Sequence, residues 1–290
     1  MRITDKLFGF INKMYKISRL ETFMFIAGLI IVVSTLFLAL FAELIAPYDP
    51  IGIIASPLQP PSAKFIFGTD TIGRDVFSRV IYGARIIMQV ILISTVISLS
   101  IGVVLGLLSG YVGGFVDRTI SLVMDSIYAF PSLILAIAVA AMIGPGVYNT
   151  ALTIAFVYIP TYFKMIRGQT LTVKEQLYVE SAKSLGSKTR TIIFSYIFPN
   201  VLPIIPVIFS LNVADTILTE AGLSFFALGV PAPTPDWGFD IKNGQRVILS
   251  GYWWPLTFPG ISVILLALGF SLLGEGLNEL MNPRRGTRLE

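Results

Sequence analysis

Residues 86–112 read IIMQVILISTVISLSIGVVLGLLSGYV and contain no charged side chain. An α-helix rises about 1.5 Å per residue, so roughly 20 consecutive apolar residues cross the hydrocarbon core of a bilayer, which is about 30 Å thick. This stretch is therefore predicted to be a transmembrane helix. Comparable apolar runs lie near residues 22–46, 117–143, 147–166, 197–225 and 255–280. We therefore expect six transmembrane helices.

The composition also indicates a membrane protein. Of the 290 residues, 54% are hydrophobic and 13% are charged, which leaves too little polar surface to cover a soluble globule of this size. Closed β-barrels are built from short segments of alternating polarity, so the long runs favour an all-α, polytopic helical bundle. The first run is long and lacks a clear cleavage site, so we expect it to remain as an anchor.

The residue types that are missing exclude several chemistries. The chain has no cysteine and no histidine, which excludes disulfides, thiolate nucleophiles and the usual zinc sites. It also lacks a G-x-x-x-x-G-K-[ST] loop that would bind ATP phosphates. We therefore expect no catalytic residue, metal or cofactor on this chain. The pI is about 9.2, but the basic residues form no single stripe, so nucleic acid is not an expected ligand.

The basic residues predict the orientation in the membrane. If the N-terminus is cytoplasmic, the positive residues that fall outside are Lys64, Arg74, Arg79, Arg85, Lys242 and Arg246, and all other Lys and Arg lie inside. Such an excess of positive charge on the cytoplasmic side orients multispanning chains. The expected organisation is a cytoplasmic segment 1–21, a first transmembrane helix 22–46, an extracytoplasmic segment 47–85, a core of five helices over 86–280 and a cytoplasmic tail 281–290.

The two larger external segments have distinctive compositions. Residues 47–85 are rich in Pro and Gly, and Asp75 is predicted to cap a short amphipathic helix on the outer surface. In residues 230–254, prolines are expected to hold the chain extended. The tryptophans of this segment favour the membrane interface, and they are Trp237, Trp253 and Trp254.

The run 86–112 contains glycines at helical spacing. Gly102, Gly106 and Gly110 recur every four residues, and Gly114 continues the interval. Glycines at this spacing lie on one face of a helix and allow a neighbouring backbone to approach closely. We expect them to be helix-packing residues, inside the bundle or against a partner chain.

The cytoplasmic loop 172–199 is predicted to form a helix-turn-helix. Thr172 and Glu175 fit a capping box, so a helix is expected to begin at Thr172. Gly186 suits the left-handed residue that ends such a helix. Residues that share one face of this helix at helical spacing are Val173, Leu177, Tyr178, Ser181, Ala182 and Leu185.

The second half of this loop predicts another short helix. Ser187 is expected to cap it and Pro199 to close it before the fifth apolar run. Two short helices with an apolar face have no core of their own. We therefore expect the loop to dock into a groove on another protein.

The same loop resembles a known family. Glu180-Ser181-Ala182, followed by Gly186 and Pro199, resembles the Glu-Ala-Ala…Gly signature of importer-type ATP-binding-cassette (ABC) permeases, with Ser181 in place of an Ala. The chain also resembles, over nearly its whole length, the C-type permease of dipeptide, oligopeptide and nickel uptake systems. The motifs that carry this resemblance are FGTDTIGRD (67–75), AFP (129–131), FPNVLP (198–203), EAGLSFFALGV (220–230), PDWG (235–238) and LGEGL (273–277).

This resemblance implies a type I ABC importer permease fold with cytoplasmic coupling helices, in the cytoplasmic membrane. It implies a heterodimer with a homologous second permease, two ABC ATPases that bind ATP and Mg, and an extracytoplasmic substrate-binding protein. Membrane lipids surround such a bundle. The residues that match the ATPase-coupling loop are Tyr178, Glu180, Ser181, Ala182, Leu185, Gly186 and Pro199.

Charged residues within the predicted spans are candidates for the translocation path. A carboxylate facing lipid at the bilayer centre costs about 2.5–3.5 kcal/mol, so these residues should face the bundle interior or a wet cavity. Asp125 lies near the inner end of its span, which favours a structural hydrogen bond or ion pair. Asp215 and Glu220 either line the path or have a structural role. Pro131 is expected to kink its helix.

The resemblance leaves the substrate open. Family frequency favours di- or oligopeptides, while the same architecture serves oligosaccharides and nickel chelates. A secondary transporter would need inverted repeats and coupling-ion ligands, and no repeat is evident in this sequence. An intramembrane enzyme would need a nucleophile with a base or a metal cluster, and a structural scaffold is a further alternative.

Overall fold

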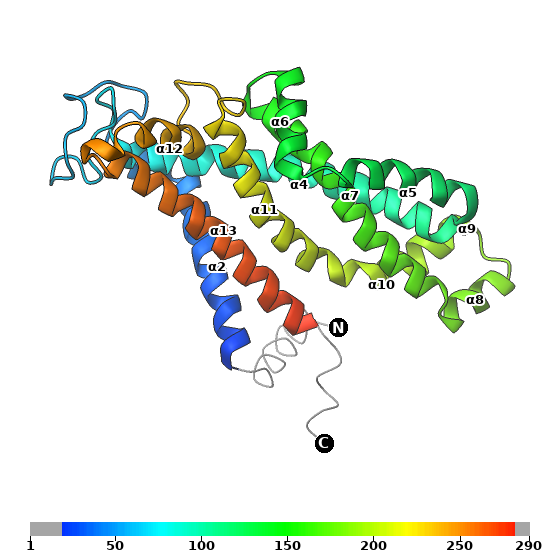
Figure 1. Cartoon of the computed structure of the whole chain (residues 1–290). Coiled ribbons are helices and arrows are strands. Elements are labelled where there is room, and N and C mark those ends of the chain that lie inside the picture. Colours follow the sequence, from blue (N-terminus) through cyan, green and yellow to red (C-terminus); the bar gives the residue numbers. More distant parts are fainter. Residues whose placement is uncertain (1–18, 282–290) are drawn as a thin grey trace.

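The structure is a computed structural model that describes residues 19–281 (Figure 1). Within this range all regular elements are helical, and the one β-type pairing is an isolated bridge between Thr69 and Asp75. The all-α prediction is therefore confirmed. The predicted tail, and all but the last residues of the predicted N-terminal segment, lie outside the described residues. The longer helices are α2 (Arg19–Leu40), α4 (Val76–Val112), α5 (Gly114–Tyr128), α6 (Ser132–Ile143), α7 (Val147–Lys174), α11 (Ile205–Phe225) and α13 (Trp254–Met281).

Shorter elements connect these helices. They form the end of the molecule that carries α12, the loop after α7 and the approach to α11. These elements are α3 (Ala42–Ile45), α8 (Leu177–Ser184), α9 (Thr189–Thr191), the π-helix η1 (Ile192–Ile197), α10 (Phe198–Val201), η2 (Leu202–Ile204), α12 (Trp237–Gln245) and η3 (Ile248–Ser250). Figure 1 shows α12 at one end of the molecule and α8 at the opposite end.

The structure leaves open the predicted number of six membrane-crossing helices. Among residues 19–281, four stretches are long and apolar enough to cross a bilayer, and α5 with α6 makes a fifth if the pair counts as one broken span. α7 has 28 residues but is more polar. Thr150 and Thr153 of α7 are buried, so these two polar side chains face protein rather than lipid. The six-span count is therefore not confirmed.

The predicted span 117–143 is broken in the middle. α5 ends at Tyr128, α6 begins at Ser132, and the two axes differ by 92°. Pro131 immediately precedes α6. Proline has no N–H to donate and its ring clashes with the preceding turn, so a helix cannot continue through it without distortion. The expected kink is therefore a corner between two separate helices.

α4 begins ten residues before the predicted span. Asp75 caps it by accepting a hydrogen bond from the Ser78 N–H at 2.7 Å, as expected. The helix then continues without a break to Val112. The prediction of a separate amphipathic helix on the outer surface is therefore wrong. The first turns of α4 are buried, because Val76 and Arg79 pack inside the end of the molecule that carries α12.

α4 packs closely against α7 along the glycine face. A Cβ atom added to these glycines would lie only 2.5–2.9 Å from a Cβ of α7, opposite Tyr162 for Gly102, Ile166 for Gly106 and Thr170 for Gly110. Only glycine allows this approach of the two backbones. Gly114 does not continue the face, because it begins α5 with a φ of 59°.

The outer segment 230–254 is folded more tightly than predicted. It contains α12, and two of its three tryptophans are buried. The Trp237 indole donates a hydrogen bond to the Val80 carbonyl at 2.9 Å, and Trp254 donates to the Thr69 carbonyl at 3.0 Å. The prediction of interfacial tryptophans is therefore wrong for Trp237 and Trp254. Trp253 is half exposed.

Candidate functional site

A cavity of about 440 Å³ lies where the corner between α5 and α6 meets α7 and α11. This volume is within the range of small-molecule sites, which is about 300–1,000 Å³. Backbone and side chains of the corner form one wall. The polar side chains of the other walls are Ser132, Tyr158, Thr161, Asn212 and Asp215.

The tyrosine of this cavity is held by its neighbours. The Tyr158 hydroxyl lies 2.9 Å from the Thr219 hydroxyl of α11, and Ser132 at the start of α6 lines the same cavity. This bond links α7 and α11 beside the cavity. Sequence reasoning missed Tyr158 and Ser132, because they lie on different helices and carry no motif of their own.

Asp215 is the one charged residue in the cavity lining. Its side chain is exposed, and no other described residue forms a hydrogen bond or an ion pair with it. Of the two predicted path candidates, it is therefore the one that the structure places on a cavity. A carboxylate that faces a polar cavity avoids the cost of facing lipid.

Glu220 lies elsewhere and has a different environment. It is completely buried, one turn before Ser224, whose hydroxyl donates to Glu220 Oε1 at 3.2 Å. Its carboxyl group also interacts electrostatically with that of Asp236, which is 1% exposed and caps α12, while Glu220 Oε2 has no hydrogen-bond partner among the described residues. Glu220 does not line the cavity, so its placement on the path is not supported. Two adjacent buried carboxyl groups require a shared proton to avoid a like-charge repulsion.

Burial also changes the acid–base behaviour of Asp236. The pKa of Asp236 is raised above its usual value of 3.8, mainly because burial disfavours the charged carboxylate. Interactions with Glu220, with the Phe239 N–H and with Ser224 oppose this shift. The pair therefore joins α11 to α12 through a protonation-dependent contact.

Asp125 forms an ion pair, in agreement with the structural role expected for it. Its carboxylate lies 2.8 Å from the Lys164 ammonium of α7. The same ammonium lies over the Tyr128 ring, 3.8 Å from its centroid. A second pair links the same helices, because Asp117 of α5 accepts two hydrogen bonds from Arg167 at 2.5 and 2.6 Å. Sequence reasoning missed this second pair, since its members are 50 residues apart.

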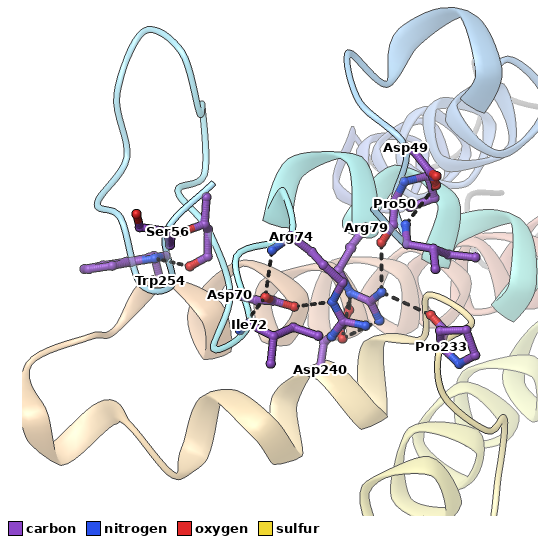
Figure 2. A network of polar contacts seen from close by, with 12 residues as sticks. Asp49, Pro50, Ser56, Asp70, Ile72, Arg74, Arg79, Pro233, Asp240 and Trp254 are labelled. Carbon is purple, nitrogen blue, oxygen red and sulfur yellow. Dashed lines mark hydrogen bonds and ion pairs between the residues drawn. The ribbon is translucent and has the colours of Figure 1, made fainter. Parts of the chain in front are cut away.

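A buried arginine joins several segments at the end of the molecule that carries α12 (Figure 2). Arg79 of α4 lies 2.7 Å from Asp240 of α12, and its Nη1 donates to the carbonyls of Pro50 and Pro233 at 3.0 and 3.3 Å. Arg79 is 1% exposed. Three segments that are distant in sequence therefore meet at one guanidinium, whose planar fork suits several acceptors at once.

The loop after α7 departs from its predicted boundaries. α7 continues to Lys174, and Thr172 donates its hydroxyl to the Gly168 carbonyl at 3.2 Å, inside that helix. The next helix, α8, begins at Leu177. The predicted capping box is therefore wrong. Thr172 has an acceptor one turn back within a continuing helix, which competes with the capping role.

Gly186 has the conformation predicted for it. Its φ is +79°, and the Ser187 N–H donates to Ala182 while the Gly186 N–H donates to Lys183. These two bonds are the Schellman pattern that ends helices at a left-handed glycine. Ser187 does not cap the next helix, because Lys188 occupies that position without a side-chain bond.

Pro199 also has a different role from the predicted one. The chain is helical without interruption from Thr189 to Phe225, with the π-helix η1 just before Pro199 and a 3₁₀ turn, η2, around Pro203. Wider and tighter turns of this kind accommodate the missing proline N–H. Pro199 therefore lies within a continuous, locally distorted helix and does not close one.

The faces of α8 also differ from the prediction. Val179 and Ala182 are 3% and 5% exposed, because this side packs on η1. Ala182 is therefore not on the outward face, contrary to expectation. Leu177 and Leu185 are 79% and 86% exposed. We call the outward residues Leu177, Tyr178, Ser181 and Leu185 the α8 outer face.

Glu180 lies beside a second groove. This groove has a volume of about 710 Å³ and lies between the C-terminal end of α4 and α8. Its charged lining residues are Lys174, Glu175, Glu180 and Lys183. Glu180 and the α8 outer face are therefore both accessible at the end of the molecule opposite α12 (Figure 1).

Comparisons with known proteins agree with this architecture. Residues 102–287 match the family described as binding-protein-dependent transport system inner membrane component. The chain is 39% identical over 264 residues to the dipeptide transport system permease protein DppC of Alkalihalophilus pseudofirmus, which covers 89% of this chain and 85% of the relative. It is also 39% identical over 262 residues to the probable D,D-dipeptide transport system permease protein DdpC of Escherichia coli, covering 90% and 88%.

A third relative is named for a different substrate. The glutathione transport system permease protein GsiD of Salmonella typhimurium is 39% identical over 256 residues, covering 87% of this chain and 84% of the relative. The chain therefore belongs to the family of binding-protein-dependent transport system inner membrane components. It is a permease subunit of an ABC importer, so the secondary-transporter alternative is not supported.

Proposed function

We propose that this chain forms half of the translocation path of an ATP-driven importer of di- or oligopeptides. The relatives compared above are named as dipeptide and glutathione permeases, and glutathione is itself a peptide. None of these names specifies an oligosaccharide or a nickel chelate. The cavity at Asp215 is of a size suited to a small peptide.

The observation that carries this proposal is the exposed outer face of α8. Leu177 and Leu185 lie on the exposed side of α8, and Val179 and Ala182 lie on its buried side. The helix is therefore packed on one side and uncovered on the other. An apolar helix face at a molecular end is suited to a groove on another protein. We assign that groove to the ABC ATPases, because the chain has no ATP-binding loop of its own.

The remaining partners follow from the same proposal. A homologous second permease completes the path, and an extracytoplasmic binding protein delivers the substrate at the end that carries α12. Both termini are cytoplasmic in this arrangement. ATP and Mg bind to the ATPases, and this chain contributes no catalytic group.

The proposal is tested on the complete transporter, purified from its native membranes through a tag on this chain. We expect the ATPases to copurify and the reconstituted complex to import a dipeptide only with its binding protein and ATP. Leu185→Glu should release the ATPases, since it places a charge on the α8 outer face. Leu249→Glu is the matched control, because Leu249 is 99% exposed at the other end of the molecule. Full ATPase recovery with Leu185→Glu would overturn the assignment.

A further inference from the structure

The structure points to a cation-binding subsite at Asp215. We propose that its carboxylate binds the free α-ammonium group of a peptide as the peptide passes through the cavity. This inference rests on the proposed function, because it names the substrate group that the path would recognise. It concerns the permease itself and is separate from selection by the binding protein.

Asp215 is placed where a ligand in the cavity can reach it. It lies on α11 and lines the 440 Å³ cavity together with Ser132, Tyr158, Thr161 and Asn212. Those four residues are uncharged, so the lining as a whole is negative. A carboxylate accepts hydrogen bonds and cannot donate them, which makes an ammonium group its natural partner.

The other carboxylates of α5 and α11 differ from Asp215 in having partners. Asp125 is paired with Lys164, and Asp117 is paired with Arg167. Glu220 shares its buried site with Ser224 and Asp236. Asp215 has no such hydrogen-bonding or ionic partner among residues 19–281. A charge within a membrane bundle that has no partner in its own chain marks a functional position.

Lys164 is a cation beside the corner between α5 and α6. Lys164 contacts the Tyr128 ring, and Tyr128 itself lines the cavity. Its ammonium is already engaged by Asp125 at 2.8 Å. No cation among residues 19–281 therefore pairs with Asp215, which leaves its carboxylate available to a ligand. An exposed carboxylate forms only a moderate ion pair, which suits a path where a ligand must also leave.

The test uses the absence of cysteine from this chain. Thr161→Cys places a thiol on the wall of the same cavity, and its alkylation rate is measured in reconstituted complexes without the binding protein. We expect Ala-Ala to slow this alkylation and N-acetyl-Ala-Ala to be at least tenfold less effective. Adding Asp215→Asn should remove the difference between the two peptides, since one charge-assisted hydrogen bond accounts for about a tenfold change in affinity. Adding Glu275→Gln, an exposed site on α13, should leave it unchanged.

The outcomes separate this inference from the proposed function. Equal protection by both peptides, or protection that survives Asp215→Asn, overturns the ammonium subsite while the transporter still imports peptides. Loss of the second permease from the Asp215→Asn complex also overturns it, because Asp215 would then pair with that subunit. If the Thr161→Cys complex with its binding protein imports none of the peptides that the unmodified complex imports, Ser132→Cys replaces it as the reporter. The same outcomes then decide. An unmodified complex that imports no peptide removes the proposed function itself.

Discussion

Arg79 of α4 and Asp240 of α12 form a buried ion pair across 161 residues of sequence, with the guanidinium donating to both carboxylate oxygens at 2.7–3.0 Å. Burial raises the pKa of Asp240, and the facing Arg79 opposes this shift. The pair also brings the loop at Pro50 and the loop at Pro233 to one guanidinium (Figure 2). The end of this permease that carries α12 is therefore built from three segments that are separate in sequence.

This pair predicts a large effect on stability. Asp240→Asn should lower the free energy of unfolding by about 3–5 kcal/mol, because it leaves a buried guanidinium without its counter-charge. The matched control is Glu43→Gln, since Glu43 pairs with Arg85 but its side chain is 70% exposed. That change should cost less than about 1 kcal/mol. Denaturation of the purified complex measures both, and equal losses would contradict the assigned role of Arg79.

The glycine face between α4 and α7 predicts a steric effect. Gly106→Ala places a Cβ 2.9 Å from the Ile166 Cβ, so the helices must separate, at a cost of about 1–3 kcal/mol. Gly168→Ala is the control, because no atom lies within 4 Å of a Cβ added there. Alanine is also a better helix former than glycine, so that variant should gain about 0.5–1 kcal/mol. Thermal unfolding of both variants in the same detergent tests the difference in sign.

The turn after α8 predicts a defect in coupling. Gly186→Val should disfavour the left-handed conformation by about 1–2 kcal/mol and misplace α9 relative to α8. Gly186→Asn should be much milder, since asparagine tolerates this conformation. The readouts are ATPase copurification and the ratio of peptide uptake to ATP hydrolysis. If valine and asparagine behave alike, the backbone conformation at Gly186 is not what matters.

The carboxyl pair of Glu220 and Asp236 predicts a dependence on pH. The folded state raises the pKa of Asp236 above 3.8, so the stability linked to its protonation is fully present below pH 3.8 and is lost as pH rises through the folded-state pKa. The unfolding temperature of the complex should therefore fall over this range. Asp236→Asn should flatten the profile while keeping the cap at the Phe239 N–H. An unchanged slope would place the titrating group elsewhere.

The orientation predicts a labelling pattern. Single cysteines at Lys64 and Gln245 should react with an impermeant reagent added to intact cells, since both positions are exposed and belong to the outer segments. Cysteines at Lys183, Lys13 and Arg288 should react only after the cells are opened. Labelling of the Lys183 position from outside would reverse the assignment of the α8 end to the cytoplasm.

Much of this architecture could be predicted from local sequence. The apolar run 86–112 indicated a membrane helix, because a backbone in lipid must satisfy its own hydrogen bonds. Gly186 and Asp75 were predicted correctly, since a left-handed glycine and a capping aspartate are properties of a few adjacent residues. Gly102, Gly106 and Gly110 indicated a packing face for the same local reason.

Boundaries and burial depended on contacts between distant segments. α4 covers only the last part of the predicted external segment 47–85, where Arg79 pairs with Asp240, and α7 continues past Thr172 to Lys174. Composition could not distinguish Asp215 from Glu220, because both are isolated carboxylate residues in the same apolar run. Only the packing of α6, α7 and α12 around α11 put Asp215 on a cavity and Glu220 beside Asp236. Sequence alone determined a helical membrane bundle and its family, whereas the tertiary structure decided which charges meet a partner, because that depends on distances between residues far apart in the chain.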